Sequence, residues 1–362
     1  MPPSIGAMEY YLLEPKELMA RILQAKERLG ERVLVLGHHY LRDDVMRFAD
    51  VQGDTLSLCL EGRQRPQAEY LVFGGVRFMA ETADLFRGEH QKVILPEPTA
   101  GCPLAEMADL KQLEACWEEL TELLGEGEVL PLAALPSSAE AKALAGRHGG
   151  AVCTPSNAPQ VLAWALDQAS RVLFFPDQHL GRNAGAKVGL EEEEMVIWDP
   201  FRPQGGLSPK TLRRARLILW KGHCPVHQRF TLQQVRQMKA LNPGLRVIVH
   251  GGCRFEVAQA ADAWGSSEDI RRRIASSPPG SRWAVGAELH LVHRLAKENP
   301  DKSILHLDSC VCVCPPMFRI GPHSLGWVLE NLVQGKIVNQ VKVPEEVAPW
   351  AGKALERMLS LP

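Results

Sequence analysis

Nine cysteines are spread along the 362-residue chain, and their spacing is typical of a metal centre with an open position. Cys102 and Cys224 each stand alone, whereas Cys310, Cys312 and Cys314 form one close group. A structural zinc site usually draws its ligands from C-x-x-C pairs, which these positions lack. Three thiolates can instead hold a cluster of four irons and leave one iron open as a Lewis acid.

Spacing alone does not select Cys314 over Cys310 and Cys312 as the third ligand. Four further cysteines lie among apolar neighbours and are expected to be buried, unreactive thiols: Cys59, Cys116, Cys153 and Cys253. An odd number of cysteines also excludes a fully paired disulfide framework.

Composition excludes several classes of protein. Hydrophobic residues make up 45% of the chain and charged residues 23%, which is ordinary for a globular protein. The net charge of −2 gives no general attraction to nucleic acid or membrane. No run of about 18 apolar residues and no signal-peptide pattern is visible, so we expect a cytoplasmic protein in a reducing compartment.

Elements that could position the cysteines recur three times along the chain. Short apolar strands alternate with helical stretches, which indicates α/β layering. The expected strands are 33–37, 70–74 and 92–95 in the first unit, 129–135, 151–154, 172–175 and 196–198 in the second, and 246–250, 261–264, 282–286 and 303–307 in the third. Each unit is followed by a cysteine, although nine scattered cysteines would sometimes fall this way by chance.

The repeat predicts three similar small parallel-sheet α/β domains around a pseudo-threefold axis, with a central iron–sulfur cluster. The expected domains are 1–98 together with 315–362, then 99–220 with an insertion, then 221–314. The C-terminal helices are expected to pack back on the first domain.

Polar residues gather where the expected strands end, which is where parallel sheets bind ligands. His38 and Tyr40 end the first strand of unit one, His250 ends that of unit three, and His227 lies beside Cys224. A single histidine is more often structural, but equivalent strand ends favour a shared site. Serine pairs at 137–138 and 266–267 precede helices, where they either hold a carboxylate or phosphate or simply cap the helix.

Long motifs along the chain resemble the quinolinate synthase family, in its longer form with an insertion between Gly181 and Leu219. They include GHHYLRDD at 37–44, AGCPLAEM at 100–107, FPDQHLGRN at 175–183 and WKGHCPVHQ at 220–228. Further matches lie at 48–50, 53–56, 78–83, 314–317 and 327–332.

The resemblance implies a transferase of NAD biosynthesis that condenses iminosuccinate with dihydroxyacetone phosphate to quinolinate, releasing phosphate and water. It implies a [4Fe-4S] cluster on Cys102, Cys224 and Cys314, which selects Cys314 among its neighbours. An L-aspartate oxidase or dehydrogenase would supply iminosuccinate. Matching site residues are His38, Tyr40 and His227 as catalytic groups, and His38, Thr55, His250, Ser266 and Ser267 as substrate-binding groups.

The chain departs from the family pattern around the substrate. Residues that replace the usual polar groups are Ala134, Pro136, Pro155, Gly252, Ala287 and His293. Each lost buried partner is expected to weaken binding or the transition state by about 1–3 kcal/mol. Two alternatives therefore stand beside quinolinate synthesis: a paralogous cluster-dependent lyase or dehydratase for another small acid, and a non-catalytic cluster protein serving as sensor or scaffold.

Overall fold

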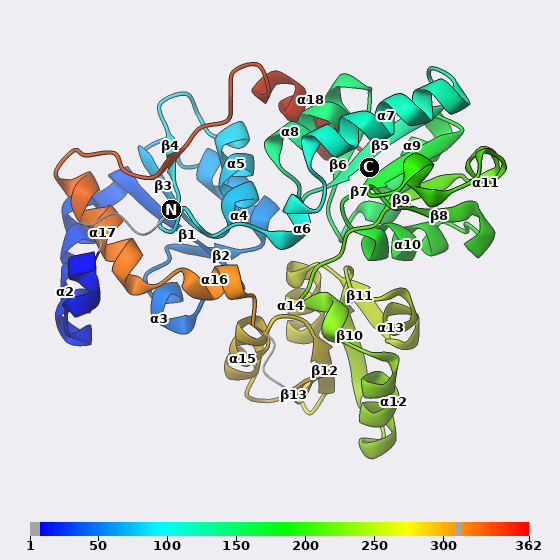
Figure 1. Ribbon diagram of the computed structural model, residues 1–362. Coiled ribbons are helices and arrows are strands. Elements are labelled where there is room, and N and C mark those ends of the chain that lie inside the picture. The colour runs from blue at the N-terminus through cyan, green and yellow to red at the C-terminus, as the bar shows by residue number, and fades with distance from the viewer. Residues whose placement is uncertain (1–7, 309–312, 362) are drawn as a thin grey trace. The chain divides into compact units, whose positions relative to one another are not determined.

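The computed structural model describes residues 8–308 and 313–361, and it arranges them as strands alternating with helices in three parallel sheets (Figure 1). The chain divides into two compact units. The first sheet lies in one unit, whereas the second and third sheets lie in the other. Among the described residues, no helix combines the length and apolar character needed to span a membrane.

The first sheet is built from the N-terminal part of the chain and has the strand order β14-β4-β3-β1-β2. Its elements are η1 (Glu9–Leu12), α2 (Pro15–Leu29), η2 (Gly30–Arg32), β1 (Val33–His38), α3 (Asp43–Met46), β2 (Val51–Gly53), α4 (Thr55–Arg63), β3 (Tyr70–Gly74), α5 (Arg77–Phe86), β4 (Lys92–Ile94), α16 (Pro315–Arg319), α17 (Pro322–Val333) and β14 (Gln340–Val341). All six residues of β1 are buried, as expected for a central parallel strand covered on both faces by helices. β14 alone runs antiparallel, on the edge formed by β4.

The second sheet has the order β6-β5-β7-β9-β8, and all its neighbouring strands are parallel. Its elements, with the helices that lead into and follow it, are α6 (Pro103–Glu106), α7 (Leu110–Leu124), β5 (Val129–Ala134), α8 (Ala139–Arg147), β6 (Ala151–Cys153), α9 (Ala158–Gln168), β7 (Arg171–Phe175), α10 (Gln178–Lys187), η3 (Glu192–Glu194), β8 (Met195–Trp198), η4 (Pro203–Gly206), α11 (Pro209–Arg214), β9 (Leu217–Trp220) and α18 (Ala348–Ser360). The insertion expected in this domain therefore supplies β8, which extends the sheet beside β9.

The third sheet has four parallel strands in the order β11-β10-β12-β13. Its elements are η5 (His227–Arg229), α12 (Leu232–Leu241), β10 (Arg246–His250), α13 (Phe255–Ala260), β11 (Ala263–Gly265), α14 (Ser267–Ala275), β12 (Arg282–Gly286), α15 (Leu289–Glu298) and β13 (Ser303–His306).

A common strand order relates the three sheets. In each sheet the first strand along the chain lies between the second and the third, and a fourth lies beyond the third: β2-β1-β3-β4, β6-β5-β7-β9 and β11-β10-β12-β13. The prediction of three similar parallel-sheet α/β domains is confirmed. The sequence pattern did not predict β2 and β9, although each completes the common order. The exact boundaries proposed at 98/99, 220/221 and 314/315 stay a prediction.

The prediction that both C-terminal helices pack back on the first domain is wrong for the last one. α17 packs against α2, but α18 packs against α8 and β6 of the second sheet. Two close approaches explain this position. The Trp350 carbonyl oxygen lies 1.9 Å from where a Cβ on Gly146 would be, so only glycine permits the contact. Arg357 of α18 also donates a hydrogen bond to the Gly150 carbonyl.

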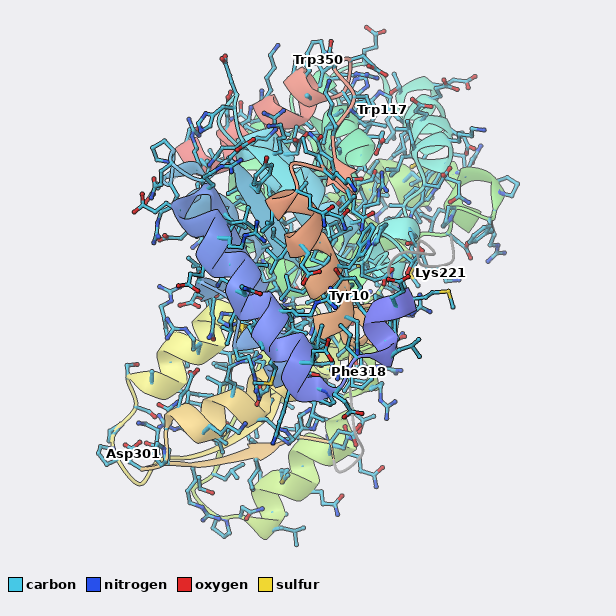
Figure 2. The ribbon with its side chains drawn as sticks, turned by 90° about the vertical axis from the view of Figure 1, so that its left-hand side faces the viewer. Tyr10, Trp117, Lys221, Asp301, Phe318 and Trp350 are labelled. Atoms are coloured by element: carbon cyan, nitrogen blue, oxygen red, sulfur yellow. The ribbon has the colours of Figure 1, made fainter. Side chains whose placement is uncertain are left out.

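Gly146→Ala is expected to destabilise the protein by about 1–3 kcal/mol, because the new methyl group overpacks the contact between α8 and α18. The Tm from thermal unfolding measures the effect. Gly352→Ala is the matched control: it adds the same methyl to α18, which carries Trp350 (Figure 2), where nothing lies within 4 Å. Helix propensity alone would favour alanine at both positions by about 1 kcal/mol, so equal Tm gains in the two variants would contradict the contact.

Candidate active site

The first strand of each sheet ends at an equivalent point. β1 ends at His38, β5 at Ala134 and β10 at His250. In each case the residue after the strand donates its backbone N–H to the carbonyl oxygen of the last residue of the neighbouring strand. The three pairs are 39–53, 135–153 and 251–265, at 2.8 to 3.1 Å. The fold thus presents three equivalent positions at strand carboxyl ends, and two of them carry histidine.

His38 and His250 are held in the same way by the turn that follows each strand. The Nδ1 of His38 accepts the backbone N–H of Tyr40 at 3.2 Å, and the Nδ1 of His250 accepts that of Gly252 at 3.1 Å. A backbone N–H can only donate, so Nδ1 carries no proton and the neutral ring is protonated at Nε2. Each neutral imidazole therefore carries its proton on Nε2. The Tyr40 ring lies edge-on to His38, with ring centroids 4.8 Å apart.

His227 of η5 stacks on His250, with ring centroids 3.8 Å apart and an angle of 14° between the planes. Burial lowers the pKa of His250 to about 4, although the Asp269 carboxylate opposes this shift. Burial and the adjacent His250 ring hold the pKa of His227 well below its ordinary value. Both rings are therefore neutral near pH 7, and two stacked neutral imidazoles avoid the repulsion of two cations.

The His250 ring is expected to stay neutral on acidification until the pH approaches about 4. Nitrogen NMR of histidine-labelled protein, with the signal assigned by its loss in His250→Gln, reports both the tautomer and the titration. The expected spectrum shows Nε2–H and no protonation across the ordinary histidine range near 6.5. A midpoint in that range, or an Nδ1–H tautomer, would contradict the geometry.

Hydroxyl groups begin the helices that follow the second strands. Thr55 is the first residue of α4, directly after its cap Asp54, and is 5% exposed. Ser266 caps α14 through a capping box with Asp269, and Ser267 is the first residue of that helix. The backbone N–H of Ser266 already donates to the Asp269 carboxylate at 2.9 Å. Ser266 therefore has the helix-capping role that the sequence left open as the alternative to ligand binding.

The second and third sheets meet through side chains that the sequence reasoning missed. Ser156 Oγ lies 2.9 Å from Ser266 Oγ and 2.6 Å from Asp269 Oδ2, and its hydroxyl donates to one of these two atoms. Asn183 of α10 donates its Nδ2 to the carbonyls of Gly251 at 2.9 Å and Cys253 at 3.0 Å. The two Asn183 contacts hold the turn that directly follows His250.

Asp177 is a buried carboxyl that follows β7 and caps α10. Its Oδ1 accepts the backbone N–H groups of His179 at 2.9 Å and Leu180 at 3.2 Å. Burial raises the pKa of Asp177 to about 7, against these two hydrogen bonds that lower it. Its position at a strand end, inside the 175–183 motif, is the signal that could have identified it from the sequence.

The seven described cysteines fall into two groups. Cys59, Cys116, Cys153 and Cys253 are buried, as predicted, and burial raises the pKa of the Cys116 and Cys153 thiols. The three predicted ligands are partly exposed instead: Cys102, Cys224 and Cys314. Cys310 and Cys312 lie outside the described residues. In the part of the chain that the structure describes, no three His, Cys, Asp or Glu side chains form a group that could hold a metal ion.

The predicted site residues thus form two groups. The structure brings His38, Tyr40 and Thr55 to the strand ends of the first sheet. It brings a second group to the strand ends of the third sheet: His227, His250, Ser266 and Ser267. These groups lie in different units of the chain.

Three parallel α/β sheets with histidines and hydroxyls at the strand ends define a protein of the small-molecule enzyme class. The family model described as "Quinolinate synthetase A protein" matches residues 20–360. The chain belongs to the quinolinate synthase family.

Relatives match the chain over nearly its whole length. A quinolinate synthase of Streptomyces coelicolor is 49% identical over 349 residues, which cover 96% of this chain and 89% of the relative. The quinolinate synthase of Acidobacterium capsulatum is 47% identical over 363 residues, covering 99% and 97% respectively. That of Herpetosiphon aurantiacus is 47% identical over 358 residues, covering 98% and 95%.

Proposed function

We propose that the chain is a quinolinate synthase that condenses iminosuccinate with dihydroxyacetone phosphate to quinolinate, with release of phosphate and water. The observation that carries the proposal is the matched pair of strand ends, where His38 and His250 each present a neutral ring protonated at Nε2. Family membership over residues 20–360 supports the same reaction.

A [4Fe-4S] cluster fits the thiols of this chain. Of the described cysteines, the three partly exposed ones are Cys102, Cys224 and Cys314, and we propose them as the ligands. Each is followed by a proline, at 103, 225 and 315. The cluster would supply a Lewis-acidic iron for oxygen groups of the substrate.

The protein's own residues bind and orient the substrates. The Nε2–H groups of His38 and His250 donate to carboxylate or carbonyl oxygens, and Tyr40 places a phenol beside His38. His227, stacked on His250, supports that ring and is proposed to act with it in catalysis. Thr55 and Ser267, as first residues of α4 and α14, supply hydroxyls for a carboxylate or phosphate.

We propose that the enzyme acts in NAD biosynthesis in the cytoplasm, and that an L-aspartate oxidase or dehydrogenase supplies its iminosuccinate. Iminosuccinate is a reactive imine, so a supplying enzyme must produce it close to its use.

An anaerobic assay tests the proposal. Protein reconstituted with iron and sulfide, with its cluster verified, is given iminosuccinate and dihydroxyacetone phosphate, and quinolinate is measured by chromatography. Quinolinate formation that depends on both substrates is expected. No quinolinate from protein with an intact cluster would overturn the proposal. If no other acid reacts either, a non-catalytic role as sensor or scaffold would remain.

A different small acid as substrate is a second candidate, and the end of β5 favours it. Ala134 stands where His38 and His250 stand in the other sheets, and Pro136 and Pro155 add no donors beside it. An apolar lining accepts substrates that a polar lining would reject. Turnover of another hydroxy or imino acid, faster than quinolinate formation in the same assay, would establish this second function.

A further inference from the structure

The turn after β10 brings Gly252 close against a buried carboxyl. Gly252 has no side chain, and a Cβ built there would lie 2.8 Å from Asp177 Oδ2, 3.3 Å from His227 Nδ1 and 3.4 Å from His250 Nδ1. Asp177 comes from the second sheet and the two imidazoles from the third, yet all three polar atoms surround one point. A side chain at residue 252 would therefore have to displace the Asp177 carboxyl from its present position.

Helix capping accounts for only one oxygen of Asp177. Oδ1 accepts both backbone hydrogen bonds at the start of α10, whereas Oδ2 is the atom that faces Gly252. Asp177 is 3% exposed, and an ionised carboxyl is unfavourable at such a buried position without a cation. The carboxyl thus combines a fixed position with the ability to carry a proton near neutral pH.

We propose that Asp177 is the proton-exchanging carboxyl of this site, acting on substrate through Oδ2 beside His250 and His227. The inference rests on the proposed function, which includes loss of water. In that step the carboxyl donates its proton to a leaving hydroxyl, the C–O bond breaks and water departs. The carboxylate then takes the proton of the adjacent C–H bond, a C=C bond forms, and the carboxyl is neutral again.

The titratable groups that face Asp177 permit this role. Among the described residues, Cys153 of β6 feels the Asp177 charge, and the Nδ1 atoms of His227 of η5 and His250 of β10 surround the same point beside Gly252. Burial keeps both imidazoles neutral and raises the pKa of the Cys153 thiol, so none of the three holds Asp177 as a permanent ion-pair partner. A carboxyl among neutral groups retains its proton more readily than one beside a cation.

Asp177→Asn tests the proposal, because asparagine caps helices as well as aspartate but carries no exchangeable acid proton. We expect kcat for quinolinate formation to fall by about 10²–10⁴-fold, with an unchanged cluster spectrum and Tm. The decline in wild-type activity as pH rises through about 7 should disappear in the variant. The matched control is Asp109→Asn, which changes the cap of α7, where Oδ1 also accepts two backbone N–H groups. A kcat for Asp177→Asn within a few-fold of this control would overturn the inference.

A measurement without turnover separates this inference from the proposed function. The infrared band of a protonated carboxyl should appear in wild-type minus Asp177→Asn difference spectra at about pH 6 and vanish at about pH 8, on either side of the pKa. Absence of the band at both values would overturn the acid role even if the wild type makes quinolinate. Absence of quinolinate from the wild type would instead count against the proposed function.

A third variant tests the position of the carboxyl. Gly252→Ala places a methyl 2.8 Å from Oδ2 and must move Asp177 aside, so we expect kcat to fall by about ten-fold or more. Wild-type kcat in Gly252→Ala would show that the position of Oδ2 is immaterial and would contradict the inference.

Discussion

Cys314→Ala is expected to yield protein without a [4Fe-4S] cluster and without activity, whereas Cys310→Ala and Cys312→Ala are expected to keep both. Three thiolates hold the proposed cluster, so removal of one leaves only two ligands for four irons, too few to retain it. Cys314 is partly exposed and immediately precedes α16, as Cys102 immediately precedes α6. Iron and sulfide analysis after anaerobic reconstitution, together with the visible absorption of the cluster, measures the result.

The two neighbouring cysteines provide controls of the same residue type in the same segment. They lie outside the described residues, so the prediction for them comes from the sequence and the family resemblance. A cluster retained in Cys314→Ala would refute the ligand assignment. A cluster lost from Cys310→Ala, with Cys314→Ala unaffected, would move the third ligand to Cys310.

A sequence signal for Cys314 exists that spacing did not provide. Cys102, Cys224 and Cys314 are each followed by proline, whereas Cys310 and Cys312 are followed by valine. Proline fixes its own φ and is favoured at the start of a helical turn. A shared Cys-Pro pair therefore indicates a shared local backbone, and it distinguishes the three candidate ligands from the other six cysteines without knowledge of the family.

The fold could be predicted from the sequence because central parallel strands are apolar on both faces. Runs such as 33–37 and 129–135 stand out for that reason, and all residues of β1 and β5 are buried. β2 was missed because its three residues, Val51 to Gly53, include a single apolar side chain and form no buried apolar run. α18 was misplaced because its partner is set by a contact between glycine and backbone, which no amphipathic pattern encodes.

His38 and His250 of the candidate site could also be predicted, since each is the last residue of a strand, and His227 was found beside Cys224. Asn183 could not, because its significance arises from contacts between the second and third sheets, whereas the strand end and the 175–183 motif were a signal for Asp177. Asn183 is separated by 68 and 70 residues from its two partners, and nothing local shows that a helical asparagine will face the turn of another sheet. Contacts of this kind are visible only in three dimensions.

Asn183→Leu is expected to destabilise the protein by about 2–5 kcal/mol and to lower activity, because it removes two buried hydrogen bonds at once. Asn183 is fully buried, and its Nδ2 bridges the carbonyls of Gly251 and Cys253. Leucine has a similar volume but donates nothing, so both carbonyls lose this donor in a buried position. The same turn holds His250 through the N–H of Gly252, so its displacement should disturb the site as well.

Denaturant unfolding and quinolinate formation at a temperature well below the transition measure the two effects separately. Asn331→Leu is the matched control: that residue is partly exposed, and among the described residues its Nδ2 bonds only the Trp327 carbonyl of its own helix, at 2.8 Å. The control should lose less than about 1 kcal/mol. Equal losses of stability in the two variants would show that the bridge across the turn adds nothing beyond an ordinary side-chain hydrogen bond. A destabilised Asn183→Leu with unchanged kcat would show that the turn keeps its geometry without the amide. Loss of both stability and activity in Asn183→Leu, with the control intact, would establish that α10 positions His250 through the β10–α13 turn. The proposed chemistry depends on this connection between the sheets.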